Sequence, residues 1–140
     1  MQLVQRVTND REQRQAQKFA ASRGKLAQCE ARLRELQGYH DSYQRGLAQR
    51  MAQGIGAIGL RDYQAFLAKL AEAVRQQTEV VMKARAENDA QRLLWQGAAQ
   101  RTKIIDKVIE RRDAEGQRIE DAREQRATDE RALRATRGAT

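Results

Sequence analysis

The glycine-rich segment at residues 54–59 carries the only pattern in this chain that is typical of a cofactor site. It spells Gly-Ile-Gly-Ala-Ile-Gly, which fits the G-x-G-x-x-G pattern, and Glu79 follows twenty residues after its last glycine. That pattern binds a dinucleotide when it follows a β-strand and opens a helix within a βαβ unit. Here a helical pattern precedes the glycines, and no segment alternates apolar and polar residues as a strand does. We therefore interpret residues 54–59 as a plain turn and expect no cofactor.

The other reactive side chains are too scattered to build a catalytic or metal site. His40 is the only histidine and Cys29 the only cysteine, which excludes an intrachain disulfide and any metal site built from cysteines or from several histidines. Each carboxylate has a basic neighbour, so no acid–base pair stands out. We expect His40 to lie in a helix seam with its ring edge near water, and Cys29 to pack as a small apolar residue. The residues predict no enzyme, no catalytic residue and no metal ligand.

Length and composition favour an elongated helical protein over a compact globular one. The chain has 140 residues, no proline and 23 alanines, and 33% of its residues are charged. Its larger apolar side chains are too few for a broad core, whereas a long helical structure needs only one apolar stripe. No run of about 18 apolar residues predicts a membrane span, and the first residues lack the apolar stretch of a signal peptide. A cytoplasmic, all-α protein is expected.

The charge of the chain is positive and unevenly distributed. The net charge is +8, with 21 arginines among the basic residues. Residues 1–53 carry a net charge of +5, residues 54–109 carry +3, and residues 110–140 have 8 basic and 8 acidic side chains. A positive field of this size attracts nucleic acid, anionic lipid or an acidic protein. Composition alone does not choose among these three.

A seven-residue repeat of apolar side chains is the strongest structural signal. Positions seven apart, with a second set three residues later, are the a and d positions of a coiled-coil seam. The predicted seam residues are Phe19, Leu26, Cys29, Leu33, Leu36, Tyr43, Leu47, Leu67, Val74, Val81, Trp95, Ile105 and Ile109. The seam becomes polar before Phe19, is interrupted by polar residues such as Gln77 and Asn88, and is nearly gone beyond Ile119.

The repeat and the glycines together predict a long antiparallel two-helix coiled coil, a helical hairpin. We expect a single coiled-coil domain over residues 1–140, with helix one at about 4–53, a turn at 54–59 and helix two at about 60–136. A short loop between long helices makes them antiparallel neighbours. Phe19 should then lie opposite Trp95. Surface pairs four residues apart, such as Glu79 with Lys83, should add a few tenths of a kcal/mol each.

One apolar row on helix two is wider than a two-helix seam requires. Phe66, Ala73 and Val80 lie beside the seam residues that follow the turn. A strict two-helix seam uses only the a and d positions. The extra row predicts either an exposed surface for another protein or broader packing against helix one.

Several segments, in order and at matching spacing, make the chain resemble the flagellar export protein FliJ family. They are residues 36–43 (LQGYHDSY), the glycine turn, residues 60–70 (LRDYQAFLAKL), residues 74–77 (VRQQ), Trp95, residues 103–111 (KIIDKVIER), residues 124–126 (EQR) and residues 129–130 (DE). The combination of two tyrosines, a glycine turn and Tyr-x-x-Phe-Leu is the most specific part. The resemblance covers nearly the whole chain.

The resemblance implies an antiparallel coiled coil like the central stalk of rotary ATPases. Such a protein inserts its terminal ends into the hexameric export ATPase, promotes the activity of that ATPase and contacts the membrane export gate. It also escorts export chaperones, and it works on the cytoplasmic side of the cell membrane at the flagellar base. The family's gate-binding residues carry over to Phe66, Leu70, Ala73 and Gln77. The ATPase-facing residues would lie toward the open end, and the protein is expected to be a monomer on its own.

Two other functions remain open at this point. A basic coiled coil can bind nucleic acid, and its mark would be an affinity that falls steeply with salt. Against this, the basic residues are interleaved with acidic ones, so no nucleic acid is expected. A purely structural protein could instead dimerise as two long parallel helices, an arrangement that the glycines at 54–59 disfavour.

Overall fold

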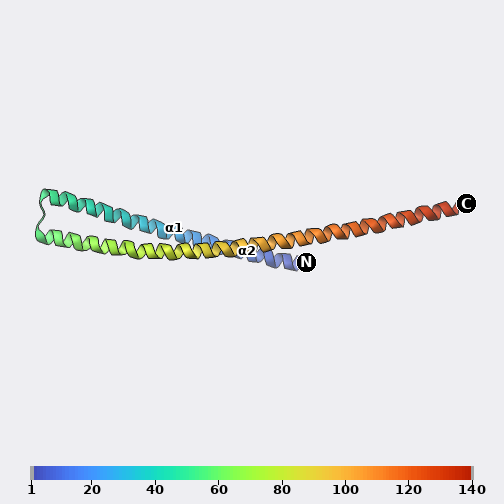
Figure 1. Cartoon of the computed structure of the whole chain (residues 1–140), viewed down its shortest axis with the longest axis horizontal. Coiled ribbons are helices and arrows are strands. Elements are labelled where there is room, and N and C mark those ends of the chain that lie inside the picture. The colour runs from blue at the N-terminus through green and yellow to red at the C-terminus, as the bar shows by residue number, and fades with distance from the viewer. Residues whose placement is uncertain (1, 140) are drawn as a thin grey trace. The chain divides into compact units, whose positions relative to one another are not determined.

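Two long helices make up nearly all of the chain. The computed structural model describes residues 2–139; Figure 1 shows helix α1, Gln2–Gln53, joined by a short connection to helix α2, Ala57–Gly138. No strand occurs between residues 2 and 139. The expected all-α, antiparallel two-helix coiled coil is confirmed, and the alternative of two long parallel helices is not the structure of this chain.

The turn is shorter than the glycine pattern predicts. Only residues 54–56 lie outside the helices, so α2 begins at Ala57 and includes Gly59. Gly54 takes the left-handed conformation, with φ of +90°, that ends many helices. The Gly56 carbonyl accepts a hydrogen bond from Leu60 N at 2.9 Å, which is the first backbone hydrogen bond at the start of α2. One glycine inside the first helical turn costs only about 1 kcal/mol, too little to stop a long helix that packs against another.

The chain divides into two compact units, which we describe separately. The larger unit comprises residues 13–96 and contains the turn. The smaller unit comprises residues 2–12 and 97–139 of the described chain. Each unit contains a segment of α1 that runs antiparallel to a segment of α2.

The seam of the larger unit is thin but continuous. Leu36 and Val81 are buried, and Phe19 stacks on Trp95 with ring centroids 5.7 Å apart, as predicted. Among the other predicted seam residues of this unit, those that are half-buried are Leu26, Cys29, Leu33, Leu47, Leu67 and Val74. Because a seam of two helices buries little surface, most of the helix circumference remains in water.

Polar residues in this seam bond across it and thereby fix the register of the two helices. The Ser22 hydroxyl donates to Asn88 Oδ1 at 3.1 Å, and Ser22 is buried. Beside the seam, Arg85 Nη2 lies 3.5 Å from Glu30 Oε1. A slip by one turn would leave the Ser22 and Asn88 side chains without these partners, which is how polar seam positions select one register.

The smaller unit has a largely polar seam that ends early. Gln5 Nε2 donates to Asp106 Oδ1 at 3.1 Å, and the Thr102 hydroxyl lies 3.3 Å from the Thr8 carbonyl oxygen. Ile105 and Ile109 are half-buried. Every residue from 110 to 139 is exposed, Ile119 included, so the seam stops ten residues sooner than the repeat predicts. The α1 segment simply offers no residue that could cover Ile119.

Two glycines on α1 should respond to alanine in opposite ways. A Cβ added at Gly38 would meet nothing within 4 Å, whereas one at Gly46 would lie 2.5 Å from the Tyr63 hydroxyl oxygen. We expect Gly38→Ala to raise the free energy of unfolding by about 0.5–1 kcal/mol, because alanine favours the helix. Gly46→Ala should give no gain, because Tyr63 must move. Urea unfolding followed by circular dichroism measures both, and an equal gain from both variants would contradict the packing described for Tyr63.

Candidate functional site

An aromatic cluster joins the two helices near the turn. Tyr43 of α1 lies against Phe66 of α2, with ring centroids 4.7 Å apart and planes tilted by 57°. The Tyr63 ring centroid is 6.0 Å from that of Tyr43, and the Arg50 guanidinium lies 5.5 Å from the centre of the Tyr63 ring. Tilted pairs at these distances are favourable because the positive edge of one ring meets the negative face of the other. Phe66 is therefore held in place although it lies at the surface.

The row of Phe66, Ala73 and Val80 forms the outward face beside this cluster, which we call the Phe66 face. Phe66 is 41% exposed and Val80 is 43% exposed, while Ala73 between them is half-buried. Residues seven apart are about two helical turns apart and so lie on the same side of α2. The hairpin covers this row only in part, which makes it an apolar surface that another molecule can reach.

Leu70 and Gln77 occupy a different position from Phe66 and Ala73. Both are half-buried on the d phase of the seam. Gln77 Nε2 donates a hydrogen bond of 3.0 Å to the Cys29 carbonyl oxygen of α1. The Gln77 side chain is thus engaged within the hairpin, and Leu70 lies at the inner edge of the Phe66 face.

Tyr43 is a residue that the heptad pattern placed in the seam and the structure places largely at the surface. It is 42% exposed and packs against Phe66. Its neighbour along α1, Tyr39, is also exposed. Two tyrosines four residues apart, opposite an apolar row, are the sequence signal that identifies this side of α1.

A short polar chain on α1 lies next to these tyrosines. The Tyr39 hydroxyl donates to Glu35 Oε1 at 3.0 Å, and Arg32 Nη1 lies 3.2 Å from Glu35 Oε2. The Tyr39 hydrogen bond and then the Arg32 contact lower the pKa of Glu35, and the same carboxylate raises the pKa of Tyr39. Glu35 therefore stays ionised and Tyr39 stays neutral near pH 7. Both side chains are exposed, so these polar contacts orient Tyr39 more than they stabilise the fold.

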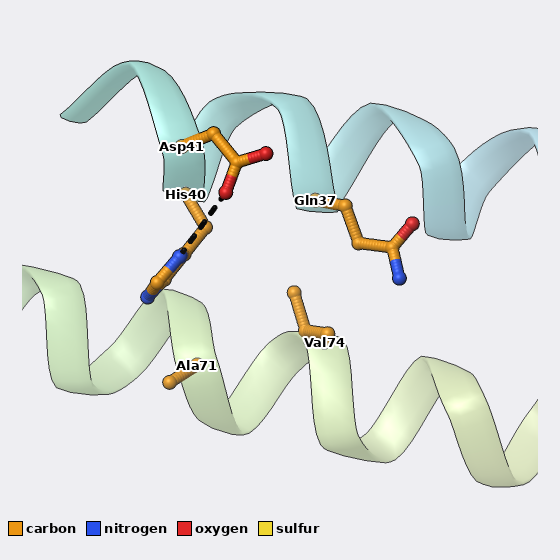
Figure 2. Close-up of a pocket in the computed structure, with 5 residues that line it drawn as sticks. All are labelled: Gln37, His40, Asp41, Ala71 and Val74. Carbon is orange, nitrogen blue, oxygen red and sulfur yellow. Dashed lines mark ion pairs between the residues drawn. The ribbon is translucent and has the colours of Figure 1, made fainter. Parts of the chain in front are cut away.

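His40 lines a shallow groove between the helices. Figure 2 shows this groove, of about 360 Å³, with Gln37, His40 and Asp41 on α1 above Ala71 and Val74 on α2. His40 Nδ1 lies 3.9 Å from Asp41 Oδ1, which is too long for a hydrogen bond.

This groove lies along the helix seam, since Val74 is one of the seam residues. No third titratable side chain lines it. No group of three or more metal-ligating side chains occurs among residues 2–139.

No helix within residues 2–139 is both long enough and apolar enough to cross a membrane. α2 has the length, but charged residues recur throughout it.

Comparison with known proteins yields one family. The family model for the flagellar FliJ protein matches residues 1–140, the whole chain. Comparison with curated proteins and with solved structures yields no match. The chain belongs to the flagellar FliJ protein family.

Proposed function

We propose that this protein is a stalk-like activator of the hexameric flagellar export ATPase. It would bind the ATPase through the C-terminal part of α2. Members of the FliJ family are non-catalytic components of the flagellar export apparatus. The observation that carries the finer proposal is the α2 segment beyond Ile109. All of its residues from 110 to 139 are exposed.

A partner that surrounds this exposed part of α2 would stabilise it. Helices obtain most of their stability from packing, and the side-chain bonds of Gln117 to Asp121 and of Gln125 to Asp129 in this segment are local. Its two large apolar side chains, Ile119 and Leu133, are exposed. The lumen of a ring could cover both while pairing with the charges around them. The segment carries 8 basic and 8 acidic residues over positions 110–140, a balance that does not favour nucleic acid as its partner.

The Phe66 face supports a second contact, with the cytoplasmic part of the membrane export gate. Phe66 is exposed yet oriented by Tyr43, and Ala73 and Val80 extend the apolar surface. We assign this contact to Phe66 and Ala73, with Leu70 at its edge. The protein would also escort export chaperones. In this role it is a monomer at the cytoplasmic side of the cell membrane, attached to the flagellar base through its partners.

The test is the turnover of the purified export ATPase with and without this protein. We expect ATP hydrolysis to rise several-fold and to saturate as the protein is added. In a separate measurement, binding of a short single-stranded DNA to this protein tests the alternative function. Unchanged ATPase turnover, together with DNA binding that weakens steeply with salt, would show that the chain is a nucleic-acid-binding coiled coil instead.

A further inference from the structure

A second feature lies on the same side of the hairpin as Phe66, farther from the turn. A groove of about 470 Å³ is lined by Lys25 of α1 and by Val80, Lys83, Ala84 and Glu87 of α2. Ala84 is buried and Val80 is 43% exposed, so the floor is apolar and the rim is charged. The groove begins where the Phe66 face ends, because Val80 belongs to both.

The two lysines of this groove make no ion pair with any residue between 2 and 139. The two carboxylates four residues from Lys83 are engaged elsewhere. Glu79 Oε1 lies 3.0 Å from Arg75 Nη1, and Glu87 Oε1 accepts a 3.0 Å hydrogen bond from Gln91 Nε2. No acidic residue lies within one turn of Lys25 along α1. Two lysines from different helices therefore line the groove together with a single carboxylate residue, Glu87.

We propose that this groove binds a carboxylate side chain of the same gate segment that docks on Phe66. This inference rests on the gate contact proposed above and specifies the chemistry of the partner. Ammonium groups beside an apolar floor favour an anionic group, because a contact partly shielded from water is stronger than one in bulk solvent. The partner is therefore an acidic segment with an apolar anchor at one end.

The spacing along α2 sets the length of that segment. Val80 lies fourteen residues after Phe66, which is about 21 Å along a helix at about 1.5 Å per residue. A partner chain in extended conformation spans this distance in about six residues. A helical partner lying along the hairpin needs about fourteen.

The experiment measures binding of the purified cytoplasmic part of the export gate to the full chain at about 50 mM and about 500 mM NaCl. The test variant is K25E/K83E. The variant K25Q/K83Q removes the two positive charges without adding negative charges that would repel a carboxylate or Glu87. The matched control is K103E/K107E, which makes the same change in net charge on α2 away from this groove. Circular dichroism checks that each variant keeps its helices.

We expect K25E/K83E to weaken binding about tenfold at low salt and to flatten its salt dependence. The control should stay within about twofold of the original chain. If K25E/K83E and K25Q/K83Q bind as the original does while Phe66→Ala binds weakly, the groove has no part in the contact and the gate proposal stands alone. If neither the lysine variants nor Phe66→Ala lose affinity, both proposals are wrong. Binding of single-stranded DNA that K25E/K83E abolishes, with gate binding untouched, would assign the groove to nucleic acid and overturn this inference.

Discussion

Removal of residues 120–140 is expected to abolish stimulation of the export ATPase while leaving the paired helices intact. Every described residue from 110 onward is exposed, so we expect the packing of α1 against α2 to survive the removal. The side-chain hydrogen bonds within the removed segment are local, such as Thr136 to the Ala132 carbonyl. The truncated chain should therefore unfold at nearly the same temperature as the full chain. ATP turnover at saturating protein and thermal unfolding by circular dichroism measure the two effects.

A double substitution distinguishes the loss of apolar contacts with the ATPase from the mere shortening of α2. I119D/L133D keeps the full helix but places charges where the two exposed apolar side chains stand. If the ATPase covers these residues, each buried charge costs several kcal/mol and stimulation should fall with it. L93A/M82A removes two exposed apolar side chains of the larger unit and should leave stimulation unchanged. Full stimulation by the chain lacking 120–140 would place the ATPase contact elsewhere on the molecule.

The heptad repeat predicted the fold because the geometry of an α-helix fixes which residues lie on the same side. Residues seven apart must lie on one side of a helix, so Leu36 and Val81 could be placed between the helices from the sequence alone. The glycines supplied the direction of the second helix, and from these two facts the stacking of Phe19 on Trp95 followed.

The repeat does not predict which ion pairs form, because two basic residues at the same spacing can compete for one carboxylate. Glu79 has Arg75 four residues before it and Lys83 four residues after it, and spacing does not distinguish them. The structure pairs Glu79 with Arg75, which also contacts Glu72 at 2.6 Å. Lys83, which lines the groove, therefore does not pair with Glu79. The expected Glu79–Lys83 pair was wrong for this reason.

The sequence predicted which residues form the Phe66 face, but it did not predict how exposed they are. The excess row of Phe66, Ala73 and Val80 is visible in the sequence, but its exposure depends on what α1 offers opposite it. Tyr43 fits the d phase yet leans out, and Gln77 fits the same phase and turns inward to the Cys29 carbonyl. A repeat assigns positions around a helix; it does not assign the direction in which a large or polar side chain turns.

Phe66→Ala is expected to weaken binding of the export gate about tenfold while leaving ATPase stimulation unchanged. Phe66 is 41% exposed, so a partner can still remove a large part of its ring from water. Full burial of such a side chain is worth about 1.5–3 kcal/mol, and roughly half of the upper value corresponds to about a tenfold change in affinity. An aromatic ring held in place before binding loses little entropy on docking, which is typical of residues that dominate an interface.

The same substitution also removes the contact with Tyr43, so its effect on stability must be separated from its effect on binding. Loss of that tilted ring pair should cost about 0.5–1.5 kcal/mol, a modest drop in unfolding temperature. Val81→Ala is the matched control, because Val81 is 4% exposed and lies in the seam of the same helix. It should destabilise the hairpin by about as much while leaving gate binding intact. Equal losses of binding in Phe66→Ala and Val81→Ala would show that Phe66 acts only through the fold. Unchanged gate binding in Phe66→Ala would remove the gate contact from this face.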